Sequence, residues 1–376
     1  MGVIIMKATS SASPDTSHVF LTLDALRGVA AIAVMTFHYS GEFGHQFFPH
    51  GYLAVDFFFM LSGFVLTFAY QTKLDRGWTT RSFLVTRLVR LYPLYFIGLV
   101  LGIFLNTMHD HSSHLHPGAR TISILILDGL LLLPAVGVPT RDHIIFPYNQ
   151  PAWSLFFEVA ANIFHALFLR RRSWKFLLGT LGVVAMAFIY SIRKFGTIDF
   201  GVSQPHAFYT FSRVLFSYLI GMLLLMVWKS GKVRLRVHPF FVAILLLLSL
   251  GAPAMPQFKT MYDLLLVVLF FPVLLLVGAS SQPGPRLVKL CHWLGISSYA
   301  VYMLHVPCSR LLDGVRHSLA RSSDNQHPWA SIISILFTIM LALLLDRFYD
   351  IPVRTFLRRK LASTTASPRI TTTIAS

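Results

Sequence analysis

Charged side chains are scarce in this chain. Only 12% of its 376 residues are charged, against about 25% in a typical soluble domain. A water-facing surface needs more charge than this, and 55% of the residues are hydrophobic. The composition therefore excludes an ordinary soluble enzyme and an intrinsically disordered chain.

Acidic residues are scarcer still. The 15 Asp and Glu residues stand against 32 Lys and Arg residues, which gives a formal net charge of +17. In a soluble protein such an excess of positive charge would indicate nucleic-acid binding. In a chain this hydrophobic, basic loops on the cytoplasmic side of a membrane explain it better. We therefore expect no nucleic acid among its partners.

Cysteine is nearly absent as well. The two cysteines, Cys291 and Cys308, form neither a disulfide framework nor a metal-binding spacing. No repeat of fixed period is visible, and we expect no appended soluble domain. A cleavable signal peptide is not expected either, because the first apolar run contains Asp24 and Arg27 and lacks a basic leader with a cleavage site.

The chain does contain a series of apolar runs long enough to cross about 30 Å of hydrocarbon. They predict an all-α, polytopic transmembrane helix bundle of about ten spans. The predicted spans are 19–40, 52–71, 88–107, 151–169, 174–192, 208–228, 237–253, 261–279, 296–316 and 329–349. An eleventh run, 122–138, is shorter and contains Pro134, so we expect it to be re-entrant or interfacial.

The distribution of basic residues predicts the orientation in the membrane. If both ends are cytoplasmic and 122–138 does not cross, most Lys and Arg residues fall on the cytoplasmic side, as the positive-inside rule requires. A complete crossing by 122–138 would move every later basic cluster to the other side. We therefore expect a cytoplasmic N-terminal segment over 1–18, a transmembrane domain over 19–358 and a disordered cytoplasmic tail over 359–376.

Ionisable residues inside membrane spans are costly, and they mark functional sites by default. Arg27 and His38 in the first span are eleven positions apart, which places both on one helix face, roughly 16 Å apart along the axis. Asp24 shares that face and is positioned to pair with Arg27. Asp56 in the second span lies at nearly the depth of His38, where a carboxylate would hold the tautomer of an imidazole. The alternative interpretation is a structural Asp–Arg pair and an interfacial histidine.

Two later spans each carry a stripe of polar residues along one helix face. The first stripe is Ser154, Glu158, Asn162 and His165, and the second is Ser298, Tyr302, His305 and Ser309. A polar stripe on a membrane helix must face protein or water rather than lipid. The stripes therefore predict a hydrated cavity inside the bundle, which fits either a catalytic site or a transport pathway.

Two arginines stand at the start of the third span. Arg87 and Arg90 are i,i+3 neighbours on a helix, so both are able to hold the same anion. The alternative is that they only follow the positive-inside rule.

The outer loop His109–His116 contains four histidines, a residue type that binds transition metals. Because no preorganising helix or cysteine accompanies them, we expect a solvated loop there and no metal site.

Several motifs occur in an order that resembles a known family, the integral-membrane acyltransferases of family 3. These motifs are LDALRG from Leu23, then His38, GYLAVDFFFMLSGF from Gly51, RLVRLYPLY from Arg87, WSLFFE from Trp153, GISSYAVYMLH from Gly295 and FYDIPVR from Phe348. The family includes O-acetyltransferases that modify bacterial surface polysaccharides, lipopolysaccharide and some antibiotics. The resemblance covers residues 20–358.

Three features depart from the family pattern. Asp350 stands where the family usually has Glu, and Val159 follows Glu158 where a second acidic residue is frequent. Some members also carry a C-terminal extracytoplasmic hydrolase-like domain, which is absent here, so we expect the membrane domain to act alone.

The resemblance implies the donor and its site. It implies a cytoplasmic acyl-CoA, most simply acetyl-CoA, whose anionic head is bound by Arg27, Arg87 and Arg90. His38 is implied as the catalytic base or as a transient acyl carrier. The other implied catalytic residues are Asp56, which would orient His38, and Glu158, which would assist protonation or acceptor binding.

The resemblance also implies the acceptor and the location. We expect Ser154, Tyr302 and His305 to bind substrate, and the acceptor to be a hydroxyl of an extracytoplasmic or membrane-bound glycan or a lipid-linked sugar. A bacterial cytoplasmic (inner) membrane, with its lipids as partners, is the expected location. The competing class is a transporter or flippase without covalent chemistry. It predicts inverted-repeat halves with broken helices, which are not visible in this sequence.

Overall fold

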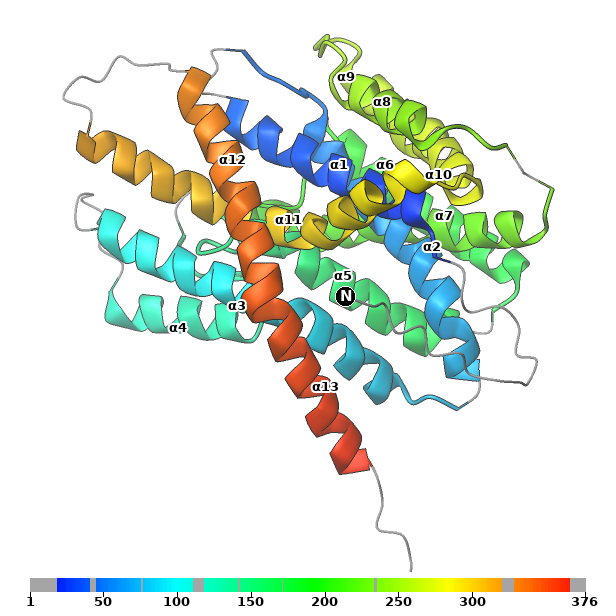
Figure 1. Ribbon diagram of the computed structural model, residues 1–376, viewed down its shortest axis with the longest axis horizontal. Helices are drawn as coiled ribbons and strands as arrows, with labels where there is room; N and C mark the ends of the chain where they lie inside the picture. The colour runs from blue at the N-terminus through cyan, green and yellow to red at the C-terminus, as the bar shows by residue number, and fades with distance from the viewer. Residues whose placement is uncertain are drawn as a thin grey trace, which may run out of the picture.

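The structure is a computed structural model that describes residues 19–40, 45–75, 77–110, 118–140, 143–170, 172–232, 235–319 and 328–365. Over these ranges the chain is helical and has no β-sheet, apart from one isolated bridge between Ile144 and Ser203. This confirms the predicted all-α, polytopic bundle (Figure 1). The N-terminal segment 1–18 lies outside the described residues.

The helices follow the predicted spans closely. In chain order they are α1 (Leu21–Tyr39), η2 (Gly51–Leu53), α2 (Ala54–Asp75), α3 (Thr80–Asp110), α4 (Ala119–Leu130), α5 (Ala152–Phe164), η4 (His165–Leu169), α6 (Trp174–Phe195), η5 (Gln204–His206), α7 (Ala207–Lys229), α8 (Pro239–Leu250), α9 (Lys259–Leu265), η6 (Leu266–Phe270), α10 (Phe271–Ser280), α11 (Pro285–Leu319), α12 (Pro328–Leu345), η7 (Asp346–Asp350) and α13 (Ile351–Thr365). Within the described ranges, nine continuous helices are long and apolar enough to span a membrane.

The short helix α8 is apolar, but with twelve residues it is shorter than the nine helices of the described ranges that could span a membrane. At its start, the Val237 amide donates to the Ser281 hydroxyl, and the Ser281 carbonyl accepts from Thr22 at the beginning of α1. At its end, the Leu250 carbonyl accepts from the His50 amide, directly before η2. Helix α8 therefore packs against α1 and is bonded at both of its ends to distant parts of the chain.

Helix α4 does not run through the bundle, although its sequence is apolar. It lies beside α3, and its last turn is held there because Tyr95 and Tyr92 donate to the carbonyls of Gly129 and Leu130. The chain then turns back, and Ile145 bonds to Val202 in the segment between α6 and α7. The run predicted as re-entrant or interfacial thus consists of helix α4, which packs against α3, and the irregular segment that follows it.

Two tightly packed helix pairs form the centre of the bundle, α1 with α11 and α2 with α7 (Figure 1). Gly28 lets α1 approach α11 so closely that a Cβ atom there would overlap the backbone of Leu294. Gly63 has the same function between α2 and α7, where a Cβ atom would overlap the Tyr218 carbonyl oxygen. Small residues at these crossings fix the relative positions of the helices.

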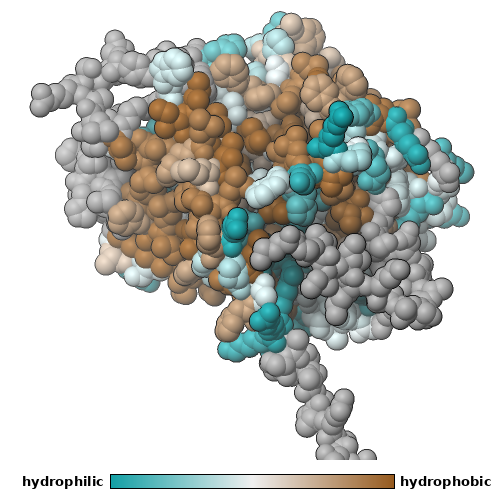
Figure 2. Space-filling model, in the orientation of Figure 1, coloured by the Kyte–Doolittle hydropathy of each residue, from teal (hydrophilic) through white to brown (hydrophobic). Residues whose placement is uncertain are grey.

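The outer surface of the bundle is apolar. Phe208 is 82% exposed and Met186 is 65% exposed, and Figure 2 shows hydrophobic side chains over most of the face in view. Apolar exposure on this scale is costly in water but matches a surrounding lipid phase. The protein is therefore a multi-pass membrane protein.

The predicted boundary at 358 does not coincide with the end of an element. Helix α13 continues to Thr365, because residues such as Arg358, Lys360 and Leu361 are good helix formers. Helix α13 thus covers residues 359–365 of the predicted tail, and 366–376 lie outside the described residues.

Candidate active site

A cavity of about 540 Å³ lies between α1, α2, α3, α5 and α11. Its lining on α2 runs from Val55 to Lys73, which is about 27 Å of helix at 1.5 Å per residue. The lining residues with polar side chains are Asp24, Arg27, Ser62, Lys73, Arg87, Arg90, Ser154, Glu158, Ser298, Tyr299 and Tyr302. The prediction that both polar stripes face a common cavity is therefore confirmed for Ser154, Glu158, Ser298 and Tyr302.

Three guanidinium groups line this cavity, those of the arginines that the family resemblance implies as donor-binding residues. Arg27 on α1 bonds to Asp24 at 3.1 Å and to the Ser298 hydroxyl at 2.9 Å. Arg87 on α3 is buried and donates to Glu158 at 2.6 Å. Arg90 has no hydrogen-bond or ion-pair partner among the residues that the structure describes. Four basic side chains line the cavity against two acidic ones, so the cavity favours an anion.

Glu158 lies at the arginine cluster rather than beside His38. One of its carboxylate oxygens accepts from both Arg87 and the Ser62 hydroxyl. This geometry holds Arg87 in place, and the two carboxylate bonds tie α5 to α3 and α2. A direct role of Glu158 in protonation or in acceptor binding stays a prediction.

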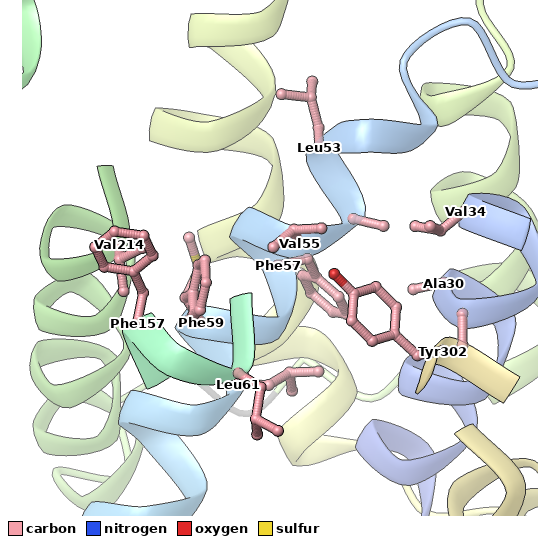
Figure 3. Close-up of a cluster of buried hydrophobic side chains, with 14 of the residues drawn as sticks. Ala30, Val34, Leu53, Val55, Phe57, Phe59, Leu61, Phe157, Val214 and Tyr302 are labelled. Carbon is pink, nitrogen blue, oxygen red and sulfur yellow. The ribbon is translucent and has the colours of Figure 1, made fainter. Parts of the chain in front are cut away.

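Tyr302 and Ser154 meet at the other end of the cavity. Their hydroxyl groups are 2.9 Å apart, and Ser154 also donates to the Pro151 carbonyl. In Figure 3 the ring of Tyr302 lies between α1, near Ala30 and Val34, and α2, near Val55. Two of the three predicted substrate-binding residues, Ser154 and Tyr302, thus line the cavity, whereas the third, His305, does not.

His38 is exposed, and its tautomer is fixed by its own helix. Its Nδ1 atom lies 2.9 Å from the Val34 carbonyl oxygen. Because a carbonyl oxygen can only accept, Nδ1 carries the proton in the neutral ring, and Nε2 keeps its lone pair. The accessible Nε2 is therefore the basic atom of this side chain.

His305 is the nearest ionisable neighbour of His38. The two ring centroids are 4.8 Å apart. Nδ1 of His305 lies 2.6 Å from the Tyr302 carbonyl oxygen, so Nε2 also lacks a proton here. This Nε2 atom is buried and has no partner within the described part of the chain.

Asp56 does not contact His38, which corrects the prediction that it orients the imidazole. Its carboxylate is fully buried and accepts from Arg213 on α7: Nη2 donates to Oδ2 at 2.6 Å, and Nε donates to Oδ1 at 3.0 Å and to Oδ2 at 3.2 Å. Ser217 donates a further, longer bond to Oδ1. A buried carboxylate needs a charged partner, and the guanidinium supplies it. Matched depth on neighbouring helices was therefore not sufficient to predict the contact.

Two polar groups of the bundle were missed by the sequence reasoning. Arg213 lies inside the predicted span 208–228, and Asp263 lies inside 261–279, where it bonds to His50 and to the Tyr52 hydroxyl. The rule that ionisable residues in spans are functional suspects applies to both and would have found them.

The remaining predicted residues lie away from the cavity lining. In the closing motif, Arg354 contacts Asp350 at 2.5 Å and Asp346 at 3.3 Å, and η7 with α13 packs against α3. Helix α3 ends at Asp110, inside the predicted histidine loop His109–His116, and residues 111–116 of that loop lie outside the described residues. In the described ranges, no three His, Cys, Asp or Glu side chains gather as metal ligands would.

The comparison with known proteins identifies the family. Residues 20–347 match the sequence profile of a family described as "Acyltransferase domain". The chain belongs to this family. The resemblance seen in the motifs is therefore confirmed, and so is the expectation of an acyltransferase enzyme. Among solved structures, no significant match was found.

Several curated proteins are similar to this member of the acyltransferase family. It is 37% identical to protein 2 in the picA locus of Rhizobium radiobacter over 189 residues, which are 47% of this chain and 96% of that protein. It is 24% identical to the peptidoglycan O-acetyltransferase OatA of Listeria monocytogenes, over 89% of this chain and 55% of that protein. It is 26% identical to the exopolysaccharide production protein ExoZ of Rhizobium meliloti, over 72% of this chain and 80% of that protein. The chain thus spans only about half the length of OatA.

Proposed function

We propose that the protein moves an acyl group, in the simplest case acetyl, from a cytoplasmic acyl-CoA to a hydroxyl group of an extracytoplasmic or membrane-bound glycan or lipid-linked sugar. The observation that carries the proposal is one elongated, cationic cavity that extends from the arginine cluster to Tyr302, with the His305–His38 pair directly behind Tyr302. The names of the relatives OatA and ExoZ support a glycan as acceptor.

The cationic half of the cavity suits the head of an acyl-CoA. CoA carries several phosphate groups joined to a long, flexible pantetheine arm that ends in the thioester. Arg90, which has no partner among the described residues, and Arg27, which is partly exposed, offer guanidinium donors for phosphate oxygens. Glu158 holds Arg87 in position beside them. The apolar half, along α2, suits the pantetheine arm, so the thioester approaches Tyr302.

The chemical step follows from the tautomer of His38. Its unprotonated Nε2 takes the proton of the acceptor hydroxyl, and the oxygen attacks the thioester carbonyl carbon. A C–O bond forms, the C–S bond breaks, and the His38 imidazolium returns the proton to the departing CoA thiolate. The products are the acyl ester and free CoA, and no other reactant is needed.

His305 and Asp56 take supporting positions in this proposal. The bare Nε2 of His305, next to the ring of His38, is placed to accept a hydrogen bond when His38 becomes protonated. Asp56 neutralises Arg213 and joins α2 to α7, so it acts through the fold rather than on the imidazole.

The proposed orientation places the arginine cluster at the cytoplasmic face, with both chain ends on that side of a bacterial cytoplasmic membrane. The excess of basic residues supports it. In this orientation, donor and acceptor approach His38 from opposite sides of the membrane.

Inverted membrane vesicles test the function directly. Labelled acetyl-CoA added to the outside of such vesicles has access to the cytoplasmic face only. Vesicles with the wild-type protein should transfer label to envelope glycan, and alkaline hydrolysis should release it as acetate. Vesicles with equal amounts of His38→Ala should not. Equal labelling by both proteins would contradict the proposed function and favour a role without covalent chemistry.

A further inference from the structure

Two aromatic rings line the end of the cavity that lies toward the histidine pair. Phe58 on α2 and Tyr302 on α11 both line the cavity, and their ring centroids are 5.5 Å apart in an edge-to-face contact. The bond between the Tyr302 and Ser154 hydroxyls fixes the tyrosine ring in this position. Phe58 is half-buried, with its exposed side toward the cavity.

The histidine pair lies immediately behind Tyr302. The ring of Tyr302 is 5.6 Å from that of His305, which in turn is 4.8 Å from that of His38. A group at this end of the cavity therefore approaches the histidine pair beside Tyr302.

Each of the two helices that carry the rings is packed tightly against another helix. Helix α11 is packed against α1 at Gly28, backbone against backbone, and α2 is packed against α7 at Gly63 in the same way. The buried Asp56–Arg213 ion pair ties α2 to α7 a second time. With both helices held in this way, a smaller side chain at position 58 leaves space that the surrounding structure only partly fills.

We propose that Phe58 and Tyr302 set the length of the acyl group that the protein transfers, and that they restrict it to short acyl chains. The inference rests on the proposed acyl-CoA donor. An acetyl group adds one methyl group beyond the reacting carbonyl, whereas each further methylene needs volume that these rings fill. Replacement of the Phe58 ring by a methyl group opens that volume to longer chains.

The experiment measures kcat/KM for acetyl-, propionyl-, butyryl- and hexanoyl-CoA with one acceptor preparation. The wild-type protein should prefer acetyl-CoA. In Phe58→Ala the ratio of butyryl to acetyl should rise, since each methylene that gains an apolar environment is worth about fourfold. For the two added methylenes of butyryl, we expect a rise of about 15-fold. Tyr302→Phe keeps the ring volume and should keep the wild-type ratio.

Phe68→Ala is the matched control, because Phe68 lies on the same helix and lines the same cavity near Lys73. This variant should slow all four donors alike and leave their ratios unchanged. Phe58→Leu removes less volume and replaces Phe58→Ala if the latter does not fold; it should shift the ratio in the same direction by a smaller factor.

The outcomes separate this inference from the proposed function. Wild-type activity with acetyl-CoA and an unchanged butyryl-to-acetyl ratio in a folded Phe58 variant would overturn the assignment of the rings alone. The same shift in Phe68→Ala would also overturn it. No transfer from any donor by the wild-type protein would contradict the proposed function, and the assignment of the rings with it.

Discussion

Substitution of Asp56 by Asn removes one charge from an ion pair that is sealed inside the bundle. The side chain of Asp56 is 0% exposed and that of Arg213 is 1% exposed, and the two are joined by bonds of 2.6 and 3.0 Å. Because no water reaches the pair, the guanidinium in Asp56→Asn stays charged without a counterion. Loss of one partner of a buried pair costs about 3–5 kcal/mol. We expect a loss of this size in the free energy of unfolding.

A double-mutant cycle separates the pair from its surroundings. Arg213→Gln should destabilise the protein by a similar amount, because it leaves the Asp56 carboxylate unpaired. The double variant has two neutral amides that are able to bond to each other, so it should lose less stability than either single variant. Denaturant unfolding of the purified protein in detergent, followed by tryptophan fluorescence, measures all four free energies. Losses that simply add would refute the assignment of Asp56 and Arg213 as a structural pair.

Transfer activity distinguishes this interpretation from an orienting role on His38. If Asp56 acts through the fold, then Asp56→Asn protein that is still folded should keep kcat within about tenfold of the wild type, whereas loss of the base costs about 10²–10⁴-fold. A stable Asp56→Asn protein with the activity of His38→Ala would show that the carboxylate serves the imidazole after all.

Three further predictions concern the donor site, the base and the topology. Arg90→Ala should weaken acetyl-CoA binding by roughly tenfold or more, the equivalent of about 1.5–3 kcal/mol, and leave the free energy of unfolding unchanged. Arg87→Ala should lower both the acetyl-CoA affinity and the free energy of unfolding, because it removes the charged partner of Glu158. Calorimetric titration measures the affinities and denaturant unfolding measures the stabilities, and equal stability losses in the two variants would contradict this prediction. His38→Ala should lower kcat by at least about 10²-fold without changing acetyl-CoA affinity, and a changed affinity would place His38 in the donor site. Single cysteines at 118–121 and 143–150 should react with an impermeant thiol reagent from the same, outer side, and labelling from opposite sides would show that 122–138 crosses the membrane.

The positions of the helices were predictable because they depend on apolar length alone. Each predicted span corresponds to a helix in the structure, and the shorter run 122–138 corresponds to α4 and the irregular segment that follows it. Helix α8 was predicted as 237–253 but extends only over Pro239–Leu250. Its flanking bonds to Ser281 and His50 join residues distant in the sequence, which no local pattern reveals.

The cavity was predictable for a related reason. Residues four apart on one helix share a face, so Ser154 with Glu158 and Ser298 with Tyr302 had to point to common surroundings. Lipid excludes such stripes, and the only place left for them was the interior. The same argument failed for His305, the third residue of its stripe, which is not part of the cavity lining and whose ring meets that of His38 instead.

Contacts between helices were not predictable, and Asp56 shows why. Helix geometry converts a residue number into a height and a rotation along its own helix, but it gives no orientation of one helix relative to another. At the height of Asp56 the carboxylate had at least two cationic candidates, His38 on α1 and Arg213 on α7. Electrostatics decides between them once the packing is known: Arg213 is always charged and binds with two parallel N–H groups, whereas His38 already donates Nδ1–H to its own helix at Val34. A tautomer held by a backbone carbonyl needs no carboxylate, so the assignment of His38 as the base does not depend on Asp56.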